Sequence, residues 1–401
     1  MITKEMRSGL RTWIEVDTGA IKKNYDSLRG ILPKTCKMMA VVKSNAYGHS
    51  LIDFSKEISK LGADWIGVDS VVEGFSLRRE GIALPMLVLG FTLPELVAEA
   101  AEKDISLTVS SFAFFENLPK EKLSKKIVEN LVRPGLDIFR HDFRGAKIKI
   151  HIEVDTGMHR QGFLRDQKEK LFSVLKRFKD FIEVEGLYTH FAQAKDPSSL
   201  EYTRGQISQF LEWKKSFETA GFPLITHAGA TAGALLYPEA DFDMVRIASG
   251  LFGLWPSHKL REVFEKKIKL TPILSWRTLV SEVKEIGAGE SVGYELTYKL
   301  SSNAKIAICP VGYWQGLPRA LSNNAEVLLN GKRAQIIGLV SMDMIIIDCT
   351  DIPQVNVGDV VTLIGKDGKE CIDVYELANH ADTFQNEVIT RINPLIKRLY
   401  F

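Results

Sequence analysis

The feature that most limits the possible folds of this chain is a series of eight short, largely apolar segments, most of them followed by a helical pattern. The first, Met38–Val42, is an unbroken apolar run, as expected of a strand that is buried on both faces. Regular alternation of strand and helix implies right-handed crossovers and a parallel sheet. The eight segments are Met38–Val42, Trp65–Val68, Met86–Leu89, Ile105–Val109, Ile148–Val154, Val184–Tyr188, Leu224–His227 and Met244–Ile247.

Eight strand–helix units in about 250 residues match the size of a closed (β/α)8 barrel. A doubly wound open sheet is the alternative, and such a sheet usually begins with a glycine-rich dinucleotide-binding turn. No G-x-G-x-x-G pattern follows Met38–Val42. The sequence therefore predicts an α/β fold with an N-terminal (β/α)8 barrel.

The helical spacing mostly disappears after about residue 268, where short strand patterns crowd together. Leu329-Asn-Gly331 and Lys366-Asp-Gly368 are typical of hairpin turns. We expect a barrel over residues 12–255. Residues 256–401, together with residues 1–11, are expected to form a mostly-β C-terminal domain. The strands predicted for that domain are Arg277–Ile286, Lys305–Pro310, Ala325–Leu329, Lys332–Val340, Met344–Asp348 and Asp359–Ile364.

Composition argues against several classes of partner. The formal net charge of +2 gives no reason to expect nucleic acid or a lipid surface. The first eleven residues lack the apolar core of a signal peptide, so a cytoplasmic location is expected. The four cysteines, Cys36, Cys309, Cys349 and Cys371, form no C-x-x-C pair. We expect free, mostly buried thiols and no metal site.

Lys43 lies where the apolar segment Met38–Val42 ends. An ammonium at the mouth of such a strand is partly desolvated, which lowers its pKa and makes the amine a usable nucleophile. Lysines of this kind form Schiff bases with carbonyl compounds, including pyridoxal phosphate. The alternative is a lysine that closes the strand and reaches into water.

The segment Ala40-Val-Val-Lys43-Ser-Asn-Ala-Tyr47-Gly48-His49 resembles the cofactor-lysine signature of alanine racemases, which are pyridoxal-phosphate enzymes of the barrel type. It differs at Ser44, where alanine is common. Further similar segments follow in order, so the resemblance spans nearly the whole chain. In the barrel they are Asp155-Thr-Gly-Met-His-Arg160-Gln-Gly162, Gly186-Leu-Tyr-Thr-His190-Phe-Ala192, His227-Ala-Gly-Ala-Thr231 and Asp243-Met-Val-Arg246-Ile-Ala248.

The resemblance implies that pyridoxal 5'-phosphate is the cofactor and that Lys43 carries it. It implies that Arg160 reaches the phenolic oxygen and that Arg246 faces the pyridine nitrogen. Because a guanidinium keeps its proton, the cofactor would be a weaker electron sink than one that faces an aspartate. A salt bridge from Arg246 to Asp243 or Glu239 is the alternative. The other implied cofactor-binding residues are Tyr47, His190, Thr231 and Ala248.

The C-terminal domain would supply the second half of the site. Gly289-Glu-Ser-Val-Gly-Tyr294 resembles the family segment whose tyrosine is the catalytic base opposite Lys43. That tyrosine needs a cationic neighbourhood, which His190 and Arg246 would supply. In the family it reaches the barrel of the partner subunit, which implies a homodimer with shared active sites. Ser341-Met342-Asp343 looks like the turn that contacts the substrate carboxylate.

Several positions depart from the family pattern. Glu153 stands where many members have a carbamylated lysine, and a carboxylate there could hold Arg160 directly. Leu339 and Ala230 replace a frequent arginine and asparagine. Asn386 stands where a tyrosine usually faces the substrate methyl group, which leaves room for a polar substituent. One lost apolar wall changes discrimination by only about 1–3 kcal/mol.

The sequence therefore predicts an amino-acid racemase that interconverts L- and D-alanine through Lys43 and Tyr294, with Arg160, Met342 and Asn386 at the substrate. A serine or broad-specificity racemase is the alternative, because of Asn386. A decarboxylase of the same fold would usually carry a C-terminal cysteine–aspartate signature that we do not find. A non-catalytic pyridoxal-phosphate carrier of the barrel type would lack the β domain.

Overall fold

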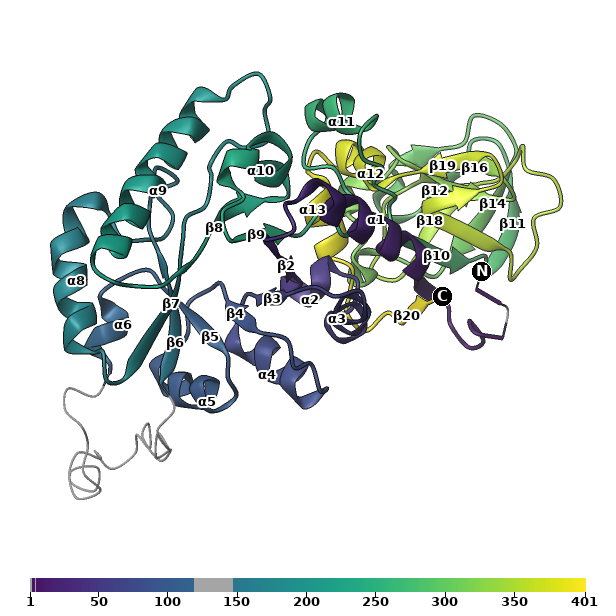
Figure 1. Cartoon of the computed structure of the whole chain (residues 1–401). Helices are drawn as coiled ribbons and strands as arrows, with labels where there is room; N and C mark the ends of the chain where they lie inside the picture. The colour runs from purple at the N-terminus through teal and green to yellow at the C-terminus, as the bar shows by residue number, and fades with distance from the viewer. Residues whose placement is uncertain (1, 4, 119–146) are drawn as a thin grey trace. The chain divides into compact units, whose positions relative to one another are not determined.

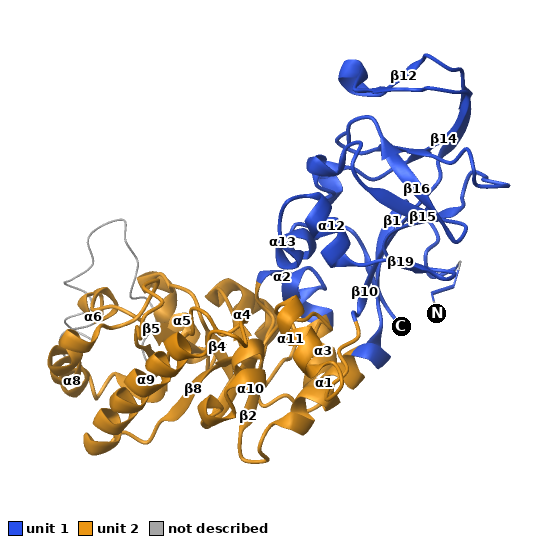
Figure 2. Cartoon of the chain, turned by 90° about the horizontal axis from the view of Figure 1, so that it is seen from above, with its two compact units in different colours: residues 1–20, 44–53, 272–401 blue, residues 21–43, 54–271 orange. Residues whose placement is uncertain are grey.

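The computed structural model describes residues 2–3, 5–118 and 147–401. The chain divides into two compact units (Figure 2). The barrel unit consists of residues 21–43 and 54–271, and the C-terminal unit consists of residues 1–20, 44–53 and 272–401.

Eight parallel strands close into a ring in the barrel unit (Figure 1), since β2 pairs with both β3 and β9. The predicted barrel is confirmed, and each strand overlaps one of the eight predicted segments. The strands are β2 (Lys37–Val41), β3 (Trp65–Val68), β4 (Met86–Val88), β5 (Ser106–Val109), β6 (Ile148–Glu153), β7 (Ile182–Tyr188), β8 (Ile225–Ala230) and β9 (Met244–Ile247).

The helices of the barrel unit lie outside the ring of strands (Figure 1). Helix α9 buries side chains three or four residues apart, including Phe210, Trp213 and Phe217, as an amphipathic helix on a sheet should. The described helices that follow β2 are α3 (Leu51–Lys60), α4 (Val71–Arg79), α5 (Val97–Glu102), α6 (Ala113–Glu116), α8 (Lys168–Arg177), α9 (Glu201–Thr219), α10 (Thr231–Leu236) and α11 (His258–Phe264).

The C-terminal unit is built on a ten-stranded sheet, with the order β11-β14-β17-β16-β15-β18-β10-β1-β20 and with β19 paired to β18. Its helices are α12 (Val374–His380) and α13 (Gln385–Thr390), and β12 (Ser291–Val292) pairs with β13 (Tyr298–Lys299) apart from the main sheet. The strands of the main sheet are β1 (Thr12–Val16), β10 (Leu274–Leu279), β11 (Glu282–Ile286), β14 (Ala304–Cys309), β15 (Glu326–Leu329), β16 (Lys332–Ile337), β17 (Ile345–Asp348), β18 (Val360–Asp367), β19 (Glu370–Ile372) and β20 (Arg398–Tyr400).

Two details of this sheet differ from the sequence prediction. The segment Arg277–Ile286, predicted as one strand, is divided between β10 and β11, which pair with different neighbours. The strand β1, which the sequence analysis placed with the barrel, pairs with β10 and β20. The domain limits 12–255 and 256–401 stay a prediction, and this pairing favours assigning residues 12–16 to the C-terminal unit.

The segment after Lys43 is a left-handed turn, labelled α2 (Lys43–Tyr47). Ser44, Asn45, Ala46 and Tyr47 all have φ between 50° and 57°. This conformation brings Cβ close to the next carbonyl and costs about 1–2 kcal/mol per residue, so the surroundings must hold it in place.

Groups from the end of the chain hold this turn within the C-terminal unit. Arg398, which is buried, donates from Nε to the carbonyl of Gly48 at 3.0 Å and from its other nitrogens to carbonyls of residues 392, 393 and 396. Tyr400 donates its hydroxyl to the carbonyl of His49 at 2.5 Å. Gly48 has φ +88°, and a Cβ there would lie 2.1 Å from the carbonyl oxygen of Ile389. Close contact with α13 therefore requires glycine.

We expect Arg398→Met to lower the free energy of unfolding by about 3 kcal/mol, because it leaves four carbonyl oxygens without their charged donor. Chemical denaturation of the purified chain measures this loss. Arg391→Met is the matched control, since its side chain is 68% exposed and, among the described residues, forms an ion pair with Glu387 alone. That change should cost less than about 0.5 kcal/mol. Equal losses for the two variants would contradict the assigned role of Arg398.

Candidate active site

Five of the predicted site residues gather at one end of the barrel. Lys43, Arg160 and His190 follow β2, β6 and β7, Thr231 follows β8 directly, and Arg246 lies within β9. Since the carboxyl ends of parallel strands meet at one mouth, the topology brings these residues to the face where barrel enzymes place their chemistry.

Lys43 is paired with a carboxylate. Its Nζ lies 2.9 Å from Oδ1 of Asp69, and the Lys43 side chain is 36% exposed. Asp69 is itself positioned by the start of α4, where Glu73 accepts hydrogen bonds from the N–H groups of Asp69 and Ser70 in a capping box. The sequence analysis expected a partly desolvated ammonium at the end of an apolar strand. The structure instead gives that ammonium a partner and partial access to water.

Arg246 is almost completely buried and is the most extensively bonded side chain of the site. Its Nη1 lies 2.8 Å from Nδ1 of His227, and its Nη2 lies 3.0 Å from Nδ1 of His190. The guanidinium also donates to the carbonyl oxygens of Thr189, His227 and Ala228. Neither Asp243 nor Glu239 is its partner, because Asp243 instead accepts from Thr226. Burial lowers the pKa of Arg246 to about 10, so it remains a cation at neutral pH.

His190 does not supply the positive charge that the sequence analysis expected. Burial, with the nearby charges of Arg246, Arg160 and Lys43, lowers the pKa of His190 to about 3. The ring is neutral, and its Nδ1 accepts from Arg246, so the proton is on Nε2. Arg246 is therefore the fixed cation in this part of the site.

Glu153 and Arg160 are close, but no ion pair joins them. Glu153 is buried, its Oε2 has no hydrogen-bond partner, and burial raises its pKa, although Tyr188, Arg246 and Arg160 oppose this effect. Arg160 is exposed and makes no ion pair with any residue in the described part of the chain. The direct contact expected between them is absent here.

Thr231 lies at the start of α10 and connects β8 with the segment after β9. Its Oγ1 accepts from the N–H of Ala248 at 3.2 Å and from that of Gly250 at 3.5 Å. Within the described part of the chain the hydroxyl proton has no acceptor, so it is left for a ligand. A Cβ on Gly250 would lie 2.9 Å from Cγ2 of Thr231, so the backbone approaches closely here.

Of the remaining predicted site residues, Ala248 lies in the barrel unit just after β9, and the others belong to the C-terminal unit. Tyr47 ends the left-handed turn and is partly buried. Tyr294 and Met342 are 70% and 55% exposed. The Oδ1 of Asn386 is buried without a hydrogen-bond partner among the described residues. The predicted site residues therefore form two groups, one at the barrel mouth and one on the C-terminal unit.

Sequence reasoning missed Asp69 and the roles of His151 and His227. Nδ1 of His151 lies 2.9 Å from Nε2 of His227, and both rings are fully buried. A polar residue inside an otherwise apolar barrel strand was the available signal, because a group buried there must find a hydrogen-bond partner. Asp69 gave no such signal, since its partner is 26 residues away in sequence.

The barrel mouth fits a planar, phosphorylated carbonyl cofactor. Lys43 offers an amine just after β2, and Thr231 offers a hydroxyl proton at the start of α10. The Nε–H of Arg246 has no acceptor among the described residues, so this buried cation keeps one donor for a ring nitrogen. Over the same residues, no cluster of metal-ligating side chains occurs, and no helix has the length and apolar character to cross a membrane.

Four histidines, three of them buried and one partly buried, make stability depend on pH. Burial lowers the pKa of His49 to about 4 and that of His190 to about 3, and it also lowers the pKa values of His151 and His227. The unfolded chain binds protons below pH about 6.5, whereas the folded chain does not. Stability is therefore fully present above that pH and is lost as the pH falls.

We expect each of these histidines to lower the free energy of unfolding by up to about 1.4 kcal/mol for every pH unit below 6.5. Denaturant titrations between pH 8 and 5 measure how steeply the free energy of unfolding depends on pH. His49→Gln should reduce this slope by the contribution of one proton, about 1.4 kcal/mol per pH unit. A free energy of unfolding that stays constant from pH 7 to 5 would contradict this account.

Comparison with known proteins agrees with this geometry. Residues 16–256 match the model of the alanine racemase N-terminal domain, and residues 273–400 match that of its C-terminal domain. An alanine racemase of Methanococcus maripaludis is 38% identical over 97% of this chain and 98% of its own length. One from Symbiobacterium thermophilum is 39% identical over 98% of each chain.

Solved structures agree as well. The alanine racemase of Bacillus anthracis with bound L-Ala-P superposes with a TM-score of 0.86 at 33% identity, covering 98% of this chain and 95% of that one. The alanine racemase from E. faecalis gives a TM-score of 0.84 at 29% identity and covers both chains fully. Enzymes of this family depend on pyridoxal 5'-phosphate. On these matches to both domains, the chain belongs to the alanine racemase family.

Proposed function

We propose that this chain interconverts L- and D-alanine with pyridoxal 5'-phosphate. The observation that carries the proposal is the barrel mouth, where the amine of Lys43 shares one face with the buried cation Arg246 in a chain whose relatives are alanine racemases. Pyridoxal phosphate, when bound, withdraws electrons from the α-carbon of an amino acid and makes its α-proton acidic.

Each residue has a role that follows from its surroundings. Lys43 holds the cofactor and transfers the α-proton on one face, with Asp69 positioned to stabilise its ammonium form. Tyr294 of the partner subunit transfers the proton on the other face. Arg246 would donate from Nε to the pyridine nitrogen of a bound cofactor and would keep its own proton, because even with burial its pKa is about 10. Two proton-transfer groups on opposite faces are what racemisation requires.

Other residues would bind and orient. Thr231 and the N–H of Ala248 lie together where the phosphate would sit, and Tyr47 and His190 complete the cofactor contacts in this proposal. Arg160 and the Met342 and Asn386 segments would face the substrate. The buried, unpartnered Oδ1 of Asn386 leaves an acceptor for such a contact.

The proposed enzyme is a cytoplasmic homodimer with two shared sites. An exposed apolar cluster on the C-terminal unit supports the dimer, and Tyr294 lies on the same unit. Backbone hydrogen bonds join two of its loops, from Tyr313 to Ser341 and from Trp314 to Met342. The exposed members are Tyr313, Trp314, Met342 and Met344. Clusters of this kind mark protein–protein contacts.

The serine or broad-specificity alternative is not favoured, because the relatives and structural neighbours are alanine racemases. The same comparisons disfavour the decarboxylase and the non-catalytic carrier.

Single substitutions test the catalytic pair. Lys43→Ala should abolish racemisation and covalent retention of pyridoxal phosphate, measured as visible absorbance after dialysis. Tyr294→Phe should retain that absorbance and impair one direction of proton transfer more than the other, measured with α-deuterated L- and D-alanine. Wild-type rates in the Lys43→Ala variant would exclude the assigned base.

Mixing the two variants tests the shared site. If Tyr294 acts on the partner barrel, a heterodimer of Lys43→Ala and Tyr294→Phe chains has one intact site. Random exchange should then restore about a quarter of wild-type activity. Each variant incubated alone is the control. No recovery, with subunit exchange shown by mass spectrometry, would place both residues in one chain.

A further inference from the structure

A chain of hydrogen bonds runs through the barrel interior from Arg246 to a carboxylate near the opposite mouth. Nη1 of Arg246 lies 2.8 Å from Nδ1 of His227, and Nε2 of His227 lies 2.9 Å from Nδ1 of His151. Nε2 of His151 lies 3.3 Å from Oε2 of Glu185, which also accepts from Ser106 at 2.5 Å. The four groups come from β9, β8, β6 and β7.

The two ends of this chain determine where every proton lies. Arg246 can only donate, so Nδ1 of His227 must accept and its proton is on Nε2. His227 then donates to Nδ1 of His151, whose own proton on Nε2 points to Glu185. A carboxylate only accepts, so the far end agrees with the near end. All the donors therefore point from the cation toward the anion.

The charge states support this order. Burial lowers the pKa values of both histidines, so they are neutral. Burial raises the pKa of Glu185, but hydrogen bonds from His151 and Ser106 outweigh it and the pKa falls below its usual range, so Glu185 is ionised. A cation and an anion thus lie at the ends of two neutral, polarised rings, which strengthen one another's hydrogen bonds.

The backbone is shaped to accept this arrangement. Gly186 follows Glu185, and a Cβ there would lie 2.2 Å from Nδ1 of His151. The pairing of β6 with β7 shifts register at His151, which lies opposite Gly186. The ring of His227 also stacks on Tyr188 with centroids 4.7 Å apart. Packing thus holds both rings in the orientation that the hydrogen bonds need.

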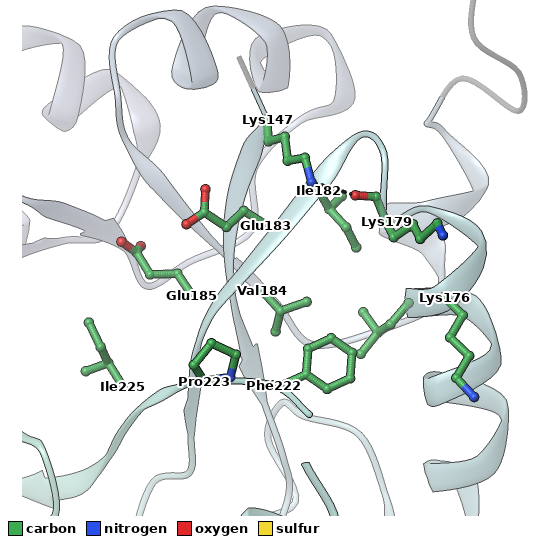
Figure 3. Close-up of a pocket in the computed structure, with 11 residues that line it drawn as sticks. Lys147, Lys176, Lys179, Ile182, Glu183, Val184, Glu185, Phe222, Pro223 and Ile225 are labelled. Carbon is green, nitrogen blue, oxygen red and sulfur yellow. Dashed lines mark hydrogen bonds between the residues drawn. The ribbon is translucent and has the colours of Figure 1, made fainter. Parts of the chain in front are cut away.

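Glu185 and Glu183 lie together in a pocket of about 550 Å³ at the amino ends of the strands, with Lys147 and Lys179 nearby (Figure 3). Glu183 is exposed on the same strand and makes no ion pair or hydrogen bond with the described residues. Of the two carboxylates, Glu185 is the one that accepts a hydrogen bond from His151.

We propose that Glu185 is a positioning residue for Arg246. By accepting from His151, it fixes the orientation of the His151 and His227 rings, and the His227 ring in turn holds the guanidinium. The proposal rests on the proposed function, in which Arg246 faces the pyridine nitrogen. Glu185 itself contacts neither substrate nor cofactor and lies at the opposite end of the barrel from Lys43.

The first test measures the histidine protons directly. Nitrogen-15 NMR of the full-length, histidine-labelled protein, with and without pyridoxal phosphate, distinguishes the Nδ1–H and Nε2–H forms. We expect His151 and His227 to be Nε2–H forms in the wild type. Glu185→Leu should keep these forms, which Arg246 dictates, but should shift the Nε2 resonance of His151 because that N–H loses its acceptor. Glu183→Leu should leave the spectrum unchanged. A charged ring or an Nδ1–H form in the wild type would overturn the proposal.

The second test uses turnover. Glu185→Leu should lower kcat about tenfold with little change in KM for alanine, since Arg246 faces the cofactor and not the substrate. Glu185→Gln keeps an acceptor oxygen and should recover most of the loss, and Glu183→Leu should match the wild type. Equal effects of Glu185→Leu and Glu183→Leu, or a change confined to thermal stability, would contradict a positioning role. A wild type without racemase activity would instead refute the proposed function and leave the NMR test standing.

Discussion

The burial of one guanidinium inside the barrel is the constraint on which the site depends. An unpaired buried cation would cost several kcal/mol, so Arg246 must find acceptors for its donors. The pairing of β8 with β9 is irregular between His227 and Ala230, and the carbonyls of His227 and Ala228 in that stretch bond the guanidinium. His190 and His227 supply neutral nitrogens and add no competing charge. The barrel thus stabilises a cation mainly with oriented dipoles, whose positions do not change with pH near neutrality.

Lys43 depends on a different kind of support. It ends a strand of the barrel unit, and the four residues that follow it have left-handed backbone conformations. Such a turn is stable only where its surroundings specify it. The supporting groups, Arg398, Tyr400 and the α13 backbone, come from the last residues of the chain. The direction in which the chain leaves Lys43 is therefore determined by contacts between segments about 350 residues apart.

Much of the fold and part of the site followed from local patterns. The eight barrel strands were found because buried parallel strands are short apolar runs separated by helices, and this periodicity requires no knowledge of contacts. Lys43 was found because a charged residue at the end of such a run is conspicuous, whereas Arg246 was found through the resemblance of Asp243–Ala248 to a family segment. The division of Arg277–Ile286 into β10 and β11 was missed, because a strand pattern in the sequence does not reveal where the chain changes pairing partners. The charge state assigned to His190 was wrong, because it depends on burial beside Arg246.

The sequence by itself determined the barrel, the mostly-β C-terminal unit and the strand ends at which chemistry could occur. These features follow from residue periodicity, which is encoded over a few neighbouring positions. Only the tertiary structure decided that Asp69 pairs with Lys43, that residues 44–47 turn left-handed, and that Arg246 is connected to Glu185 through two histidines. Those contacts depend on the register and irregularities of paired strands, which bring together side chains that are tens to hundreds of residues apart.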